Sequence, residues 1–419
     1  MLRWAEGLLG DRRWVFERPR SRGVRELRAM DGTIGIVLSG GGARGAYEFG
    51  ALEVLAPVLN EPARVIVGTS AGGLGAAYLA ANAHDGLEAA ARSGGERWLE
   101  VEIGDVIGPL CSPRELARLL LYGLELLGIR APAPPSLLDT SPQPETIAAL
   151  IDFERLARNV DDGTLATAAV VATAYATARS VVFHYGGESP PTDDRRGIDY
   201  VATRLAVEHV QASAAIQSLF PAVLVGERWY GDGGVRLNTP LKPALRLTAS
   251  RLVVIGLNSV AGPALEYDDR RPDVFDGAAA VAQSLLADQL AHDVDVLATI
   301  NDDVKESRDP ITHRLVPYIF VAPSDRLAIG RLAMDVYNRY YAGACGLHHN
   351  RELAMLGRLL DAGRNPVRGD LLSYLLFAPE FIRPLIELGR HDAQAWLDRQ
   401  GRADPWRTAH PWPSPGESS

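Results

Sequence analysis

The pattern of hydrophobic positions predicts buried strands that alternate with helices. Thr33–Leu38 is a continuous apolar run rich in β-branched residues, which is typical of a parallel strand covered on both faces. A helical pattern follows over Ala43–Leu59, and a second short strand at Val65–Val67 leads into a helix that continues to about Asn82. This order predicts an α/β fold with a mainly parallel central sheet flanked by helices on both faces.

Further elements are predicted along the rest of the chain. The expected strands are Ala168–Thr177 and Val181–Tyr185, which form a hairpin around Ala178-Arg179-Ser180, then Trp229-Tyr230, Arg251–Leu257 and Val316–Val321. The expected helices are Pro113–Leu127, Val201–Ser213, Gly277–Ile300 and the apolar C-terminal block Leu371–Leu388. A charged loop is expected over Glu266–Asp276.

The composition along the chain predicts four parts. Residues 1–30 form a basic N-terminal arm, because residues 1–28 contain eight Arg against four acidic residues. Residues 31–260 form the α/β catalytic core, and residues 261–400 form a helical part that completes or extends it. Residues 401–419 are rich in Pro, Gly, Ser and Trp without periodicity and are predicted to be a disordered tail.

The overall charge and the two cysteines narrow the class of protein. The chain has 43 basic and 52 acidic residues, a net charge of −9, which argues against a general nucleic-acid binder. Cys111 and Cys345 are the only cysteines, so no disulfide framework is implied. No secretory signal or membrane-spanning run is visible, and we expect a cytoplasmic or peripheral membrane protein. The basic arm could contact anionic lipid or be a solvated terminal segment.

The most informative motif is Gly68-Thr69-Ser70-Ala71-Gly72, which lies between a predicted strand and a predicted helix. A sharp turn of this G-x-S-x-G type lifts the serine hydroxyl out of the backbone. The N-terminus of the helix offers unpaired N–H groups and a partial positive charge beside it. This order predicts a nucleophilic serine for acyl transfer.

A serine hydroxyl needs a base to act as a nucleophile. None of the nine His lies in a sequence setting that favours this role. Asp232 directly follows a predicted strand and precedes Gly233 and Gly234. An Asp in this turn is expected near the C-terminal edge of the sheet, where Ser70 should also lie. An ordinary Asp-Gly turn is the alternative.

A glycine-rich loop, Gly40-Gly41-Gly42-Ala43-Arg44-Gly45, starts directly after the first strand. Its glycines expose backbone amides at a helix N-terminus and form a cradle for an anion. The spacing also fits a dinucleotide motif, but the second strand ends at Ser70 and not at a ribose-binding acid. We therefore predict an oxyanion hole built from Gly40, Gly41 and Gly42, with Ala71. Arg44 could support the loop, meet a phosphate or pack on the helix surface.

Together these motifs resemble those of the patatin-like phospholipase family over residues 33–260. The matching segments are Gly40–Gly45, Gly68–Gly72, Asp232–Gly234 and Ala212–Pro221, with Gln217 where many relatives have Pro. The resemblance implies a Ser–Asp dyad, in which Ser70 is the nucleophile and Asp232 the base. It also implies hydrolysis of acyl esters of phospholipids or other lipids, as a phospholipase A, lysophospholipase or esterase, without a metal or cofactor.

Three alternatives remain open from the sequence. A Ser-His-Asp esterase of another α/β-hydrolase type would need a late histidine such as His292 or His313. An acyltransferase would resolve the same acyl-enzyme with an alcohol, and a regulatory protein would use the glycine loop to bind a nucleotide. Docking at a bilayer is expected to involve the basic arm and the apolar blocks Leu116–Leu127 and Leu371–Leu388. The oligomeric state is not indicated.

Overall fold

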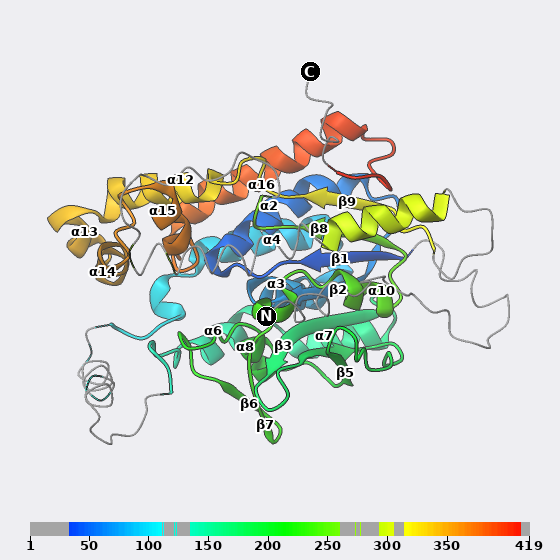
Figure 1. Ribbon diagram of the computed structural model, residues 1–419, viewed down its shortest axis with the longest axis horizontal. Coiled ribbons are helices and arrows are strands. Elements are labelled where there is room, and N and C mark those ends of the chain that lie inside the picture. The colour runs from blue at the N-terminus through cyan, green and yellow to red at the C-terminus, as the bar shows by residue number, and fades with distance from the viewer. Residues whose placement is uncertain are drawn as a thin grey trace, which may run out of the picture.

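The computed structural model describes residues 33–110, 112, 121, 123, 135–259, 273, 277, 293–305 and 314–411. Within these residues, nine strands form one sheet (Figure 1). Seven of them follow the order β5-β4-β3-β2-β1-β8-β9. Their bounds are β1 (Ile34–Leu38), β2 (Ala63–Thr69), β3 (Thr167–Ala174), β4 (Ser180–Tyr185), β5 (Ile198–Ala202), β8 (Arg251–Ile255) and β9 (Tyr318–Val321). β1 pairs in parallel with β2 on one side and with β8 on the other. β2 also pairs in parallel with β3, and β8 with β9, so the sheet is mainly parallel as predicted.

The remaining two strands, β6 (Val223–Val225) and β7 (Arg228–Asp232), form a hairpin that joins the sheet at β3. β7 runs antiparallel to β3, with Asp232 opposite Ala172. β3 has two edges. One pairs with β4 as far as Thr173, so β7 must pair with the opposite edge, which is also the edge that pairs with β2. β2 ends opposite Val171. The two strands therefore meet end to end, and the residue after β2 lies beside the last residue of β7.

Helices cover both faces of the sheet, as predicted. Right-handed crossovers place α2 (Ala46–Leu55), α3 (Ala71–Ala81) and α4 (Leu87–Glu100) on one face, because they connect strands that are added in one direction. The chain then crosses to the other side of β1, so α10 (Leu241–Arg246) packs on β1, β2 and β8 from the opposite face. The long helix α16 (Pro379–Gln400) returns to the first face and packs on α2 (Figure 1).

Shorter helices complete the described part of the chain. They are η2 (Gly42–Gly45), η3 (Ala56–Val58), η4 (Ala83–Asp85), η5 (Ile103–Asp105), α6 (Gln143–Leu150), α7 (Phe153–Asp161), α8 (Val207–Ser213), α9 (Gly234–Leu237), α12 (Ala328–Val336), η6 (Tyr337–Tyr341), α13 (Gly343–His349), α14 (Arg351–Leu359) and α15 (Pro366–Ser373). Residues 293–305 are also helical. None of the helices described here is long and apolar enough to cross a membrane.

Two predicted helices differ from the structure. The segment Val201–Ser213 starts inside strand β5, whose residues Tyr200 and Val201 pair with β4, and α8 begins only at Val207. The block Leu371–Leu388 contains the end of α15 and the start of α16, separated by residues 374–378. Most of its apolar side chains are buried, Leu372 and Leu376 at 0% exposure, so this block belongs mainly to the core.

Part of the predicted tail is ordered, and several other predicted segments lie outside the described residues. Residues 401–411 are not a disordered tail, because Arg407 pairs with Tyr318 of β9 and Trp396 Nε1 donates to the Pro405 carbonyl at 3.0 Å. The basic arm and residues 412–419 lie outside the described residues. Most of the predicted helix Pro113–Leu127, most of the charged loop and most of residues 277–292 also lie outside the described residues.

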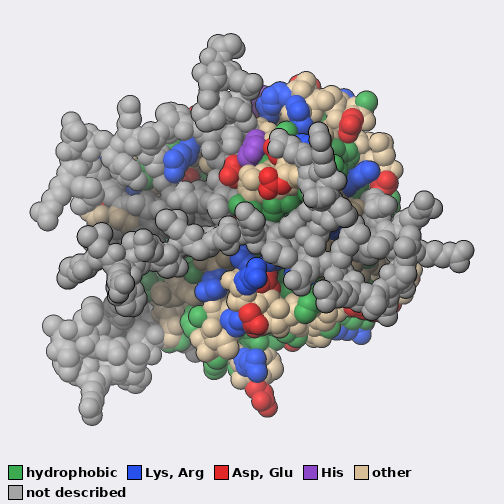
Figure 2. Space-filling view, turned by 45° about the vertical axis from the view of Figure 1, so that its right-hand side comes forward, with side chains coloured by type: hydrophobic (Ala, Val, Ile, Leu, Met, Phe, Trp, Pro, Cys, Tyr) green, Lys and Arg blue, Asp and Glu red, His purple; other side chains and the backbone are tan. Residues whose placement is uncertain are grey.

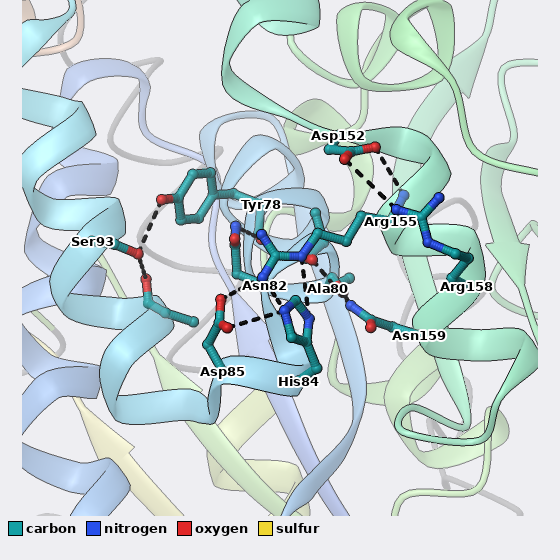
Figure 3. Close-up of polar contacts among 12 residues, drawn as sticks. Tyr78, Ala80, Asn82, His84, Asp85, Ser93, Asp152, Arg155, Arg158 and Asn159 are labelled. Atoms are coloured by element: carbon teal, nitrogen blue, oxygen red, sulfur yellow. Dashed lines mark hydrogen bonds and ion pairs between the residues drawn. The ribbon is translucent and has the colours of Figure 1, made fainter.

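The C-terminal end of α3 is fixed by side chains of α7 (Figure 3). Asn159 donates to the carbonyls of Ala80 and Ala81 at 2.8 and 3.0 Å, and this satisfies two of the last carbonyls of the helix. Arg155 contacts both His84 and Asp85 just beyond the helix end. Because α3 begins directly after β2, these contacts hold the helix that follows the G-x-S-x-G turn.

The described surface carries mixed charge. Figure 2 shows Lys and Arg side chains interspersed with Asp and Glu side chains over the part of this face that the structure describes. Pairs such as Arg92–Glu88 on α4, at 2.6 Å, are half-exposed and contribute little to stability, because water screens them. The stability of the fold therefore depends mainly on the buried core of the sheet and its covering helices.

Candidate active site

Ser70 lies on a sharp turn between β2 and α3. Its backbone has φ 55° and ψ −123°, a conformation that residues other than glycine rarely adopt. The Ser213 hydroxyl accepts the Ser70 N–H at 2.8 Å and donates to the Val171 carbonyl at 2.6 Å. A Cβ at Gly68 would overlap the carbonyl of Gly72, so the turn closes only with glycine there. These contacts hold Ser70 in a strained conformation, as the motif predicts.

The side chains of Ser70 and Asp232 are in direct contact. Ser70 Oγ donates to Asp232 Oδ2 at 2.5 Å. Both residues are buried, at 7% and 5% exposure. The contact follows from the sheet, because Ser70 follows β2 and Asp232 ends β7, and these strands meet end to end along β3. The structure thus brings together the two residues that the sequence singles out.

Asp232 is held from several sides. The Gly234 N–H donates to its Oδ1 at 2.6 Å, which leaves Oδ2 to the serine. Its backbone carbonyl accepts Gln217 Nε2 at 2.8 Å and Thr173 Oγ1 at 2.9 Å. Its backbone N–H donates to Ala215 at 2.7 Å. Gln217, the departure from the family pattern, therefore helps to orient the carboxylate through the backbone.

Burial raises the pKa of Asp232 from 3.8 to about 6. The hydrogen bonds from Ser70 and from the Gly234 N–H act in the opposite direction and favour the carboxylate. A carboxylate with this pKa is ionised at neutral pH, yet it binds a proton more strongly than an ordinary Asp. It is therefore suited to accept the proton of the Ser70 hydroxyl.

The glycine loop lies beside Ser70. A Cβ at Gly40 would come within 3.0 Å of Ser70 Cβ. The Gly40 amide already donates to the Asn238 carbonyl at 3.2 Å, so it has a protein acceptor in this structure, and its part in the oxyanion hole stays a prediction. The amides of Gly41 and Gly42 have no acceptor among the described residues. Ala71 begins α3, and its amide has no partner within that helix.

Arg44 is 1% exposed and is bound by protein acceptors. Its guanidinium forms hydrogen bonds with Ser373 at 2.7 Å and Asn258 at 3.0 Å, and an ion pair with Asp370 at 2.9 Å. Of the three roles open to Arg44, the structure favours support of the loop. A phosphate ligand would need a guanidinium that reaches solvent.

Several buried contacts around the site escape prediction from the sequence. Thr69 Oγ1 donates to the Leu237 carbonyl at 2.9 Å, and Ser39 Oγ contacts Thr239 Oγ1 at 2.8 Å. The Ser39 N–H donates to Glu48 at 2.7 Å, and burial raises the pKa of Glu48 well above its usual range. The first two contacts join the ends of β2 and β1 to the end of α9 and the residues after it, and the third joins the end of β1 to α2. The signal in the sequence is weak, because Leu237 and Thr239 are distinguished only by following Asp232 closely.

The other motif residues pack within this framework. Ala43 and Gly45 are buried in η2, directly before α2, and a Cβ at Gly233 would overlap the Val171 carbonyl. Gly72 lies against the backbone of Leu38 at the end of β1. Small residues are therefore required where the three motifs meet.

No described histidine contacts Ser70. His184 is bonded to Ser189 at 2.9 Å, and His209 accepts the Ala206 N–H at 3.1 Å. His292 and His313, the candidates for a Ser-His-Asp arrangement, lie outside the described residues. Within the same described part, no three His, Cys, Asp or Glu side chains are grouped so that they could hold a metal ion.

An apolar cavity opens beside Ser70. Its walls come from α2, α3, α4, α6 and the segment after α15, and they include the aromatic residues Phe49, Tyr78, Trp98, Phe220, Tyr374 and Phe377. The rings of Trp98 and Phe377 are stacked, with centroids 6.1 Å apart and 10° between their planes. Four polar or charged residues also line the cavity, namely Arg97, Asp105, Gln143 and Thr146. The apolar part matches the chemistry of an acyl chain.

Comparison with known proteins identifies the family. The model for patatin-like phospholipases matches residues 36–245. No curated protein matches the chain. Among solved structures, the chain is similar to VipD from Legionella pneumophila, with a TM-score of 0.29 and 15% identity over 70% of this chain. The chain covers 61% of that protein, less than two thirds of its length. Because the family model spans half of the sequence and contains Ser70, Asp232 and the glycine loop, the chain belongs to the patatin-like phospholipase family.

Proposed function

We propose that this protein hydrolyses fatty-acyl ester bonds of phospholipids or related lipids through an acyl-enzyme on Ser70. Membership of the family supports lipid acyl hydrolysis in general. The observation that carries the finer proposal is the 2.5 Å hydrogen bond from Ser70 to Asp232, beside an apolar cavity. A dyad of this kind needs no histidine, because the carboxylate itself takes the proton.

The first half of the reaction forms the acyl-enzyme. Asp232 takes the proton of Ser70 Oγ while this oxygen attacks the carbonyl carbon, and the carbonyl π electrons move onto oxygen. The amides of Gly41, Gly42 and Ala71 are the proposed donors to this oxyanion, and one well-placed donor is typically worth about 3–4 kcal/mol. The tetrahedral intermediate then expels the alcohol, which leaves with the proton that Asp232 holds.

The second half releases the fatty acid. Asp232, again a carboxylate, takes a proton from water as the water oxygen attacks the acyl carbonyl. The same amides stabilise the second oxyanion. Collapse of the intermediate breaks the bond to Ser70 Oγ, which regains its proton from Asp232. The resting hydrogen bond between Ser70 and Asp232 is then restored.

A fluorophosphonate probe tests the nucleophile. We expect the wild-type protein to be labelled at Ser70 and to release fatty acid from phospholipid or p-nitrophenyl esters. Ser70→Ala should do neither. Ser189→Ala, which removes a hydroxyl bonded to His184 away from the site, is the matched control and should behave as wild type. Wild-type protein that is not labelled at Ser70 would contradict the proposal.

The Ser-His-Asp alternative makes an opposite prediction. It requires that His292→Ala or His313→Ala abolish hydrolysis while Asp232→Asn stays active. The proposed dyad requires that Asp232→Asn abolish hydrolysis while His292→Ala and His313→Ala stay active. A nucleotide-binding role is disfavoured because Arg44, the cation of the glycine loop, is buried and bonded to Asp370 and Ser373.

Peripheral contact with a phospholipid surface is proposed for the exposed face of the β6–β7 hairpin (Figure 1). Leu224 and Trp229 lie directly opposite each other and are 47% and 54% exposed. Tyr175 is 50% exposed. Its ring lies 3.1 Å from the position that a Cβ would take at Gly231, and Gly231 is on the same face of β7 as Trp229. Trp and Tyr rings favour the membrane interface, and strand β7, which carries Trp229, ends at Asp232.

A further inference from the structure

The segment after α15 lies against the glycine loop, although it is outside the residues that the family model matches. The Ala43 N–H donates to the Tyr374 carbonyl at 3.0 Å. Gly42 has φ 59°, in the left-handed region, and a Cβ there would overlap the same carbonyl. The backbone of Tyr374 therefore sets both the conformation of Gly42 and the position of the residue that follows it.

Arg44 provides a second attachment of the loop to α15. Its Nε donates to Ser373 Oγ at 2.7 Å, and its Nη2 contacts the carbonyl and carboxylate of Asp370 at 2.5 and 2.9 Å. The guanidinium also lies 3.8 Å from the centre of the Tyr374 ring. Burial opposes the charged form, but Asp370 and Tyr374 outweigh it and raise the pKa of Arg44. A buried guanidinium with these partners is a rigid anchor.

These contacts act next to the donors of the proposed oxyanion hole. Gly41 and Gly42 directly precede Ala43 and Arg44, so a shift of either attached residue moves the two free amides. A displacement of about 1 Å in a catalytic group can cost about a hundredfold in rate. We propose that Asp370 and Ser373 are positioning residues, which together with the Tyr374 carbonyl hold the Gly41 and Gly42 amides towards the oxyanion formed at Ser70. This inference rests on the proposed function.

A merely structural role for α15 would have a different signature. Loss of packing would lower the number of folded active sites but leave the rate of each one unchanged. Loss of positioning would leave the sites countable and slow the chemical step in all of them. KM should then change little, because Asp370 and Ser373 do not line the cavity. The rate per titrated site separates the two roles.

The experiment compares Asp370→Asn and Ser373→Ala with a matched control. The control is Glu53→Gln, which breaks the 2.6 Å ion pair to Arg390 and so removes another link between the C-terminal helices and α2. Active sites are counted with the fluorophosphonate probe, and kcat and KM are measured with a p-nitrophenyl ester. We expect Asp370→Asn to lower kcat per site about 10- to 100-fold and Ser373→Ala about 3- to 10-fold, with KM within about threefold. Glu53→Gln should lower Tm without changing kcat per site.

A double variant keeps the inference open to refutation if Asp370→Asn alone is poorly folded. Because both residues act through one contact, Arg44→Gln combined with Asp370→Asn should be no slower per site than Arg44→Gln alone. An unchanged kcat per site in Ser373→Ala and Asp370→Asn, with fewer titratable sites, would overturn the positioning role. Wild-type protein with no titratable serine would instead overturn the proposed function.

Discussion

Two regions of the chain build the candidate site, and they contribute in different ways. The family-matched region, residues 36–245, carries the two proposed reacting side chains where strands β2 and β7 end. The segment from α15 to Phe377 carries none of them, but it packs on the glycine loop and forms part of the cavity wall. The first region is fixed by strand pairing and turn geometry, and the second by buried contacts between residues more than 300 positions apart.

The difference suggests a division of effects that experiments can test. Substitutions at the strand ends should change the chemical step while leaving most of the fold intact. Substitutions in the C-terminal segment should change loop position, the fit of the acyl chain or stability. The predictions below are ordered from the largest expected effect on activity to the smallest.

The largest effect is expected from Asp232→Asn. Loss of the base should lower kcat about 10³- to 10⁴-fold. The free energy of unfolding should rise at neutral pH, by up to about 3 kcal/mol, because burial of the carboxylate raises its pKa from 3.8 to about 6. The folded state binds the proton more tightly, so wild-type stability falls as pH rises from 3.8 to about 6 and the penalty is complete above that range. Urea unfolding at pH 7.5 of both proteins checks the sign, and an active, destabilised variant would contradict it.

The pH dependence gives the next largest effect. The base form of Asp232 is lost below a pKa of about 6. We expect kcat/KM to be about tenfold lower at pH 5 than at neutral pH, with a midpoint near the pKa. The residual activity of Asp232→Asn should lack this inflection. A midpoint near the ordinary Asp pKa of 3.8, measured in constant ionic strength, would mean that burial does not tune this carboxylate.

Ser213→Ala tests the support of the nucleophile within the first region. The substitution removes the acceptor of the Ser70 N–H and leaves the Val171 carbonyl without its donor. We expect the free energy of unfolding to fall by about 1–3 kcal/mol and kcat to fall about tenfold, because the strained Ser70 backbone can relax. Thermal unfolding and kcat per titrated site measure the two effects. If titratable sites and activity fall equally, Ser213 supports the fold and does not position Ser70.

The sequence predicts the first region well for a physical reason. Gly68–Gly72 and Asp232–Gly234 are local turn signals at the ends of apolar strands, so the sequence places them near one sheet edge. It does not show that β7 runs antiparallel to β3 and meets β2 end to end, which is what brings Ser70 and Asp232 together. The sequence cannot show that the Gly40 amide is taken by Asn238, because that contact depends on how α9 ends. It also reads Leu371–Leu388 as one apolar block. The break at residues 374–378, which puts Tyr374 on the loop, is decided by long-range packing.

Phe377→Leu tests the contribution of the C-terminal segment to the cavity. Phe377 stacks on Trp98 in the cavity wall, whereas Phe381 is fully buried and does not line the cavity. Both Phe→Leu substitutions should cost about 1–2 kcal/mol of stability. Only Phe377→Leu should change kcat/KM with acyl-chain length, by several-fold between short and long p-nitrophenyl esters. The same chain-length profile in both variants would remove Phe377 from substrate binding.

The smallest effect is expected from Trp229→Ser, on the exposed hairpin face of the first region. Trp229 is 54% exposed, so its loss should leave Tm and hydrolysis of soluble esters unchanged. Hydrolysis of phospholipid vesicles should fall about three- to tenfold, because less apolar surface enters the interface. Leu359→Ser is the matched control, since Leu359 is 62% exposed on α14. If both variants lose vesicle activity equally, surface hydrophobicity in general accounts for the effect. If neither does, lipid reaches Ser70 without help from the hairpin, and the role of the first region is limited to the reaction itself.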